Sequence, residues 1–300
     1  MNPDSSWLAR MSRLRVDRAR GHPAPHKPLL LLTILSRMDD GVSLPPVLPL
    51  TPELAFQFLT LGTVVAQRQT QRLDIRLPFH HLQSDGVWTA LGRDGLPSTE
   101  FRRTVAVCVD PDFATFVSNE RNRTNAMRVL IRDYFLPLEQ IALRELLNLP
   151  ADETDPMTPD GSHLVIEEAT QQGREARFRL RVVAAYNYTC ALTSYRLNTI
   201  TGATVVDAAH IHQFADSRNN DLQNGLALSK TAHWSFDQGL WSLTDDYRVL
   251  VARDHFAESG PSEFLLGGYA DRLLTIPTNP TAAPNPDYIR WHREKVFEGT

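Results

Sequence analysis

The chain has 300 residues, 42% of them apolar, and a formal net charge of −4 at pH 7. This length allows two domains, each with a hydrophobic core. A protein that simply coats nucleic acid is basic, because its affinity comes from neutralised phosphates, so the charge excludes that class. Any DNA-binding face must therefore be local, and the N-terminal half carries the more basic balance.

The composition also argues against a membrane or secreted protein. No apolar run reaches the roughly 18 residues of a membrane helix, and the N-terminus lacks the apolar stretch of a secretory signal. Cys108 and Cys190 are far apart in sequence, which excludes a disulfide framework and a four-cysteine zinc site. We expect a cytoplasmic protein.

The first half, residues 1–150, is expected to form one domain of helices and a small sheet. Helical spacing of apolar residues marks 7–20, 27–38 and 113–147. Between 79 and 109 the apolar runs are short and are separated by turn residues, which predicts small strands and turns.

An acidic stretch rich in Pro and Asp, with no helical periodicity, predicts a linker over residues 151–173. The second domain, 174–300, is expected to begin with a helix to residue 186. Two short strands and a helix follow, which is the order of a ββα hairpin. These elements are expected at 190–195, 204–208 and 229–236, and later strands at 241–244, 248–252 and 263–266, with a terminal helix at 288–297.

Four polar residues lie where the hairpin and helix would converge. They occur in the segments Asp207-Ala-Ala-His210-Ile, Asn224-Gly-Leu-Ala-Leu and His233-Trp-Ser-Phe-Asp237. An imidazole with a pKa near about 6.5 can take a proton from water at neutral pH, so His210 is the expected general base. A carboxylate and an imidazole leave coordination positions open on a divalent cation, so Asp207 and His233 are the expected metal ligands.

The neighbouring residues are assigned by their chemistry. Asn224 has two roles open to it, as a metal ligand through its amide oxygen or as an anchor of the loop that aims His210. Asp237 could orient His233, and Lys230 and Arg218 are candidates for phosphate contacts. Two histidines are expected on the surface and three aromatic residues in the core: His212 and His292, then Trp234, Phe236 and Trp241.

This segment resembles the HNH nuclease family, in particular its McrA-like branch, over residues 180–245. The resemblance implies a ββα-metal fold and phosphodiester hydrolysis with a divalent ion, Mg²⁺ or Mn²⁺, with His210, Asn224 and His233 as the catalytic residues. Ala209 departs from the family, because many members place a metal-binding Asp or His there.

Two clusters in the first half combine apolar and basic groups. His26 and Lys27 stand at the start of an apolar helix, where a phosphate can bind, although the same residues could simply pack or cap it. The segment 76–88 places Leu77 and His81 beside basic and amide groups, as a nucleotide pocket requires; its other interpretation is a strand end and a turn.

Both clusters resemble the sulfur-binding domain of McrA-like restriction enzymes that act on phosphorothioated DNA, over residues 5–148. Sulfur is larger and less hydrated than oxygen, so a small apolar cup ringed by cations prefers it. The resemblance implies that Leu77, Pro78 and His81 line this cup. The family commonly has tyrosine at the Leu77 position and a small residue at the His81 position.

Arginines also recur at near-helical intervals between residues 121 and 132, as on one helix face that could hold a DNA backbone. The residues expected to contact DNA are His26, Lys27, Arg76, Leu77, Pro78, His81, Arg121, Arg123, Arg128 and Lys230.

The expected fold is α+β, with an N-terminal DNA-reading domain and a C-terminal HNH nuclease domain. We expect a modification-dependent restriction enzyme that acts on duplex DNA, as a homodimer because one HNH site cuts one strand. The alternatives are a structure-specific nuclease of repair or mobile-element transfer, and a non-catalytic DNA-binding regulator.

Overall fold

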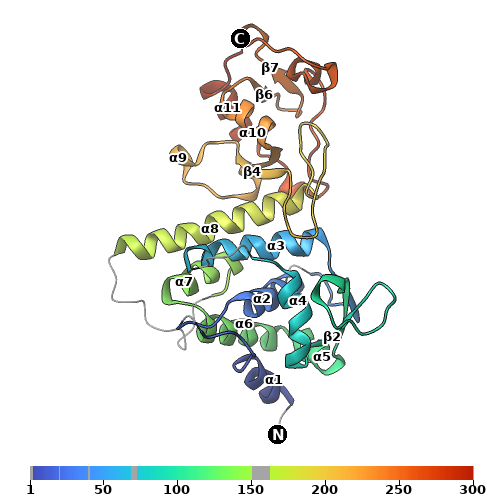
Figure 1. Cartoon of the computed structure of the whole chain (residues 1–300). Coiled ribbons are helices and arrows are strands. Elements are labelled where there is room, and N and C mark those ends of the chain that lie inside the picture. Colours follow the sequence, from blue (N-terminus) through green and yellow to red (C-terminus); the bar gives the residue numbers. More distant parts are fainter. Residues whose placement is uncertain (1–2, 20, 40, 69–72, 151–162, 300) are drawn as a thin grey trace. The chain divides into compact units, whose positions relative to one another are not determined.

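The computed structural model (Figure 1) describes residues 3–19, 21–39, 41–68, 73–150 and 163–299. Its contacts divide the chain into two compact units. The first comprises Met1–Arg177 with Thr199–Ala203, and the second Phe178–Asn198 with Thr204–Thr300. The α+β class is confirmed, and no helix of the described part is long and apolar enough to cross a membrane.

Seven helices lie entirely within the described part of the first unit: α1 (Pro3–Met11), α2 (His26–Asp39), α3 (Pro52–Gly62), α4 (Arg76–His81), α5 (Pro111–Ser118), α6 (Glu120–Tyr134) and α7 (Pro137–Leu147). Helix α2 is central, because the run Leu29–Leu32 is fully buried. A helix that is apolar on every side requires such an interior position. The helix expected over 27–38 is therefore confirmed.

The small sheet of this unit is antiparallel, with β3 (Ala106–Val109) between β1 (Val47–Pro49) and β2 (Trp88–Leu91). The start of the stretch expected to hold strands and turns is instead helix α4. Asp74 explains its start, because Oδ1 of Asp74 accepts a hydrogen bond from the backbone nitrogen of Arg76 at 3.0 Å. A side-chain acceptor at this position satisfies a donor of the first helical turn.

Helix α1 is shorter than expected and ends at Met11, although the apolar spacing continued to residue 20. The hydroxyl of Tyr134 donates to the carbonyl of Met11 at 2.9 Å and accepts from the backbone nitrogen of Leu14 at 2.7 Å. These bonds pair the backbone groups at the helix end with a side chain distant in sequence, so the helix stops there.

The expected linker is helical from His163, where α8 (His163–Ala185) begins, and residues 151–162 lie outside the described part. Ala169, Gly173 and Ala176 are buried on one face. A Cβ at Gly173 would lie 2.3 Å from the carbonyl oxygen of Ala142, so this face approaches α7 closely. Small residues permit that approach, and a search for large apolar residues overlooks them.

In the second unit, β4 (Val206–His210) pairs antiparallel with β5 (Gly225–Ser229), and α10 (Lys230–Asp237) follows directly. The ββα order is confirmed, but the strands differ from those expected. Residues 190–195 form turns, and the second strand is β5, whose residues Leu226–Leu228 are fully buried.

The rest of this unit contains α9 (Phe214–Ser217), β6 (Trp241–Leu243) paired with β7 (Val249–Val251), and α11 (Pro286–Lys295). The strand expected at 263–266 is wrong, since that stretch holds short 3-10 turns. His292 is also not on the surface: it is 1% exposed and stacks on Phe236 with ring centroids 3.7 Å apart. Burial lowers the pKa of His292 to about 4.

Candidate functional site

His210 stands at the end of β4 in an aromatic cage. Its ring is stacked on Phe178, with centroids 4.0 Å apart and planes 8° apart, and Phe214 lies at 5.4 Å. Nε2 of His210 is 2.9 Å from Oδ1 of Asn220. The stacked ring of Phe178, the tilted ring of Phe214 and the contact with Asn220 together fix the orientation of this imidazole.

His233 and Asp237 face the same way from α10, four residues apart, with His233 Nε2 3.3 Å from Asp237 Oδ2. Partial burial raises the pKa of the Asp237 carboxyl, and charges on His233 and on His210 act against that rise. Helix α10 packs against β4, so His233 and Asp237 lie on the helix next to the strand that ends at His210. Trp234, expected in the core, is 59% exposed beside them.

Asn224 is fully buried and its amide is occupied by the loop. Oδ1 accepts from the backbone nitrogen of His212 at 2.8 Å, and Nδ2 donates to the carbonyls of His212 and Asn219, both at 3.0 Å. This geometry is that of a loop anchor. The imidazole of His212, expected on the surface, stacks on Trp291 of α11 at 3.9 Å.

Asp207 does not join the histidines. Its Oδ1 accepts from Nε of Arg179 at 2.6 Å and from the backbone nitrogen of Ala208 at 2.9 Å. Side chains of a strand alternate in direction, so Asp207 and His210, three positions apart, face opposite sides of β4. The expected triad of Asp207, His210 and His233 is therefore not assembled.

No three His, Cys, Asp or Glu side chains of the described ranges are grouped as a metal site. His233 and Asp237 are the pair whose chemistry fits a divalent cation that keeps water or phosphate oxygens in its other positions. In this structure Asp237, rather than Asp207, is the carboxylate that lies beside His233. Lys230 is exposed at the start of α10, and Arg218 lies over the ring of Phe214 at 5.5 Å.

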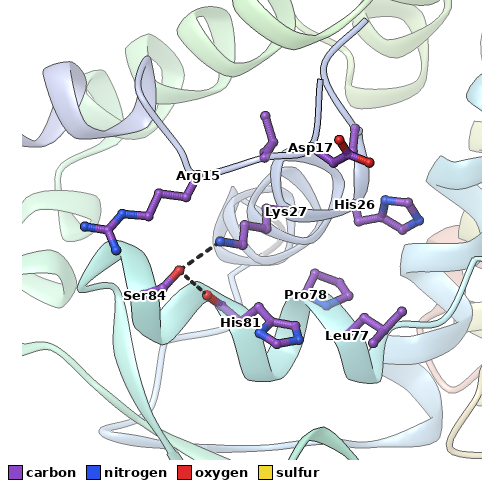
Figure 2. Close-up of a pocket in the computed structure, with 10 residues that line it drawn as sticks. Arg15, Asp17, His26, Lys27, Leu77, Pro78, His81 and Ser84 are labelled. Atoms are coloured by element: carbon purple, nitrogen blue, oxygen red, sulfur yellow. Dashed lines mark hydrogen bonds between the residues drawn. The ribbon is translucent and has the colours of Figure 1, made fainter. Parts of the chain in front are cut away.

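The two clusters of the first half meet in one pocket of about 340 Å³, here called the cup (Figure 2). Its walls come from α2, from α4 and from the segment after α1. The lining residues are Arg15, Val16, Asp17, Ala24, His26, Lys27, Leu77, Pro78, His81 and Ser84. Arg15 was not identified from the sequence, because it belongs to no motif, and Ser84 was not selected although it lies within the segment 76–88.

Lys27 is a structural cation in the cup. Its ammonium is 2.6 Å from Asp85 Oδ2 and 3.0 Å from Ser84 Oγ, and both Lys27 and Asp85 have side chains at most 10% exposed. A buried pair of this kind neutralises itself, so Lys27 brings little net charge to the cup. His26, His81 and the carboxylate Asp17 also line the cup, together with Leu77, which is 37% exposed.

Several arginines expected to face DNA are engaged within the protein. Arg76 pairs with Asp74 at 2.6 Å, and Arg123 pairs with Asp39 at 2.7 Å while also donating to two carbonyls. Arg128 donates to the carbonyl of Pro150. Arg121 is exposed on α6. The arginines of α6 thus do not form one uniform cationic face.

Together, a ββα hairpin, a caged histidine and a buried asparagine anchor define a domain of the ββα nuclease class. Residues 190–244 match the family model described as HNH endonuclease, and residues 4–151 match the model described as ScoMcrA-like, DNA sulfur-binding domain. The chain therefore carries an HNH endonuclease domain preceded by a DNA sulfur-binding domain, and both resemblances are confirmed.

One solved structure similar to this chain is titled "Modification dependent TagI restriction endonuclease". The two are 21% identical, and the match covers 40% of this chain and 38% of that one, with a TM-score of 0.30. The similarity thus spans less than half of either protein. No curated protein matches this chain.

Proposed function

We propose that this protein is a metal-dependent endonuclease that hydrolyses phosphodiester bonds of duplex DNA near a modified, phosphorothioated position. The observation that carries the proposal is the caged His210 on β4, against which α10 with His233 and Asp237 packs, within the segment that matches the HNH model. Residues 1–150 would read the DNA and residues 174–300 would cut it. A homodimer would supply the two sites that a double-strand break needs.

In the proposed reaction, His210 takes a proton from a water molecule, and the resulting hydroxide attacks phosphorus. The bond between phosphorus and the 3′ oxygen breaks, and that oxygen leaves with the electron pair and is then protonated. His233 and Asp237 would hold Mg²⁺ or Mn²⁺, which supplies positive charge for the phosphorane and the leaving oxygen. Asn224 keeps the loop around His210 in place through its three backbone hydrogen bonds.

In the N-terminal domain, the composition of the cup supports phosphorothioate as the modification that this domain recognises. Leu77 and Pro78 offer apolar surface to a weakly hydrated atom, and His26, His81 and Arg15 stand around it. Further contacts with the DNA backbone would come from Arg76, Arg121, Arg123, Arg128 and Lys230. Of these, Arg76 and Arg123 also form ion pairs within the protein.

Cleavage of matched duplexes tests the proposal. Phosphorothioated, methylated and plain versions of one sequence are incubated with purified protein in Mg²⁺, in Mn²⁺ and in EDTA. We expect cuts in the phosphorothioated duplex with either metal and none in EDTA, because the hydrolysis needs the added cation.

Three results would contradict the proposal. Equal cutting of plain branched DNA would indicate a structure-specific nuclease, and cutting only of methylated DNA would assign another mark. Binding without any cleavage, across the metal series, would indicate a regulator.

A further inference from the structure

A second pocket, of about 530 Å³, lies beside the cup in the first unit. Three arginines line it, so it is called the arginine pocket. It shares Arg15 and Ser84 with the cup, so the two pockets are neighbours. In Figure 2, Arg15 and Ser84 stand at one end of the cup, and Leu77 stands at the other. The complete lining is Ser6, Ala9, Arg10, Arg13, Arg15, Ser84, Asp85 and Gly86.

The positive charge of the arginine pocket is not neutralised by carboxylates of the pocket itself. Asp85, its one carboxylate, is 6% exposed and is bound by Lys27 Nζ at 2.6 Å and by the backbone nitrogen of Arg15 at 2.8 Å. None of the guanidinium groups of Arg10, Arg13 and Arg15 forms an ion pair with a carboxylate in the described part of the chain; that of Arg10 lies 4.5 Å from the ring of Trp7. All three arginines are exposed.

Three guanidinium groups that line one pocket without a carboxylate partner among the described residues fit a ligand that carries several negative charges. A DNA strand carries one phosphate per about 3.4 Å of helix axis, and a guanidinium binds phosphate oxygens through two parallel hydrogen bonds. A protein carboxylate would offer one charge at one point, so the pocket matches a nucleic acid backbone better than an acidic side chain.

We propose that the arginine pocket holds the backbone phosphates next to the position read by the cup, so that the DNA strand leaves the cup past Ser84. This inference rests on the proposed function, since it takes the cup as the site of the mark. It separates two tasks. The arginines supply affinity for any duplex, and the cup supplies the preference for modified DNA.

The test compares Arg10→Gln/Arg13→Gln/Arg15→Gln with Arg248→Gln/Arg272→Gln/Arg290→Gln, which removes the same charge from exposed arginines outside both pockets. Binding of phosphorothioated and plain duplexes is measured in EDTA over a salt series. For the pocket variant we expect affinity for both duplexes to fall about 10- to 100-fold at low salt. The slope of log K against log salt should shrink by about 2 to 3, because each phosphate contact contributes about 0.9.

An unchanged salt slope in the pocket variant, or an equal loss of affinity in the control variant, would refute phosphate binding by the arginine pocket. Arg13→Gln/Arg15→Gln, which leaves the contact of Arg10 with Trp7 intact, guards against a folding defect and should lower the slope by about 2. The two proposals can also be separated. If the wild-type protein binds both duplexes equally and the pocket variant still has the smaller salt slope, recognition of phosphorothioate by the cup is refuted, whereas phosphate binding by the arginine pocket is supported.

The hydrogen bond of His210 carries a second, independent inference. An amide oxygen only accepts, so Nε2 of His210, 2.9 Å from Asn220 Oδ1, bears the hydrogen, and the lone pair of the neutral ring lies on Nδ1. Asn220 is itself held in place through its neighbour Asn219, whose Nδ2 donates to the hydroxyl of Tyr288 at 2.7 Å and whose Oδ1 accepts from the backbone nitrogen of Asp221.

We also infer that Asn220 is a positioning residue that selects the tautomer of His210 and thereby the nitrogen that receives the proton. It acts through His210 and is a separate residue from the buried anchor Asn224. Asn220→Leu keeps the approximate size and removes the acceptor, whereas Asn220→Asp keeps an acceptor oxygen at the same place.

We expect Asn220→Leu to lower kcat about 10- to 100-fold with KM unchanged, and Asn220→Asp to restore most of that loss, because only the proton transfer is affected. Nitrogen-15 NMR should report the Nε2–H tautomer of His210 in the wild type and a mixture in Asn220→Leu. A wild-type kcat or an unchanged tautomer in Asn220→Leu would overturn the inference. The NMR result is independent of whether the protein cuts DNA.

Discussion

Replacing His210 with alanine is expected to abolish cleavage while DNA binding stays within about twofold of wild type. The imidazole is the group placed to take the proton from water, and loss of a general base typically costs a factor of about 10² to 10⁴ in rate. Ala208 and Ala209 already lie in β4, so a third alanine is compatible with this strand. The measurement is single-turnover cleavage of a phosphorothioated duplex, paired with a binding curve in EDTA.

His212→Ala is the matched control. Its imidazole stacks on Trp291, but its contacts with Asn224 are made by backbone atoms, which alanine retains. Cleavage by this variant should stay within a few fold of wild type. Nicking at a near-normal rate by His210→Ala would remove His210 from the mechanism, and equal losses in the two variants would indicate a general disturbance of the loop.

Asn224→Ala should destabilise the nuclease unit even without metal. The change leaves the backbone nitrogen of His212 and the carbonyls of His212 and Asn219 without their side-chain partner. An unpaired buried polar group costs about 1 to 3 kcal/mol, and because losses in one network are not additive, we expect about 2 to 5 kcal/mol in total. Thermal denaturation in EDTA measures this loss, and cleavage should fall with it.

Asn224→Asp distinguishes the anchor from a metal ligand. A carboxylate presents oxygen to the carbonyls of His212 and Asn219, which now receive a hydrogen bond from Nδ2, so the anchor role predicts lower stability in EDTA. A ligand role predicts unchanged stability in EDTA and tighter metal binding, since a carboxylate is the stronger ligand. Wild-type melting of both variants in EDTA would refute the anchor.

Local patterns in the sequence predicted much of the nuclease unit. Residue periodicity and turn chemistry act over a few residues, so they predicted the strand that ends at His210 and the helix that holds His233. They missed the partner strand β5, because the hairpin was expected between 190–195 and 204–208. The spacing from Asp207 to Asp237 selected His210, Asn224 and His233. The apolar run 29–32 likewise determined a buried helix, since no surface helix tolerates it.

Only the tertiary structure decided which partners these residues meet. Arg179 of α8 binds Asp207, whereas Asp237 lies beside His233. Tyr134 binds the end of helix α1, which lies more than a hundred residues earlier in the chain. The cup, too, joins two segments distant in sequence. Hydrogen bonds and ion pairs between distant residues depend on how elements pack, and no local period or spacing records that packing.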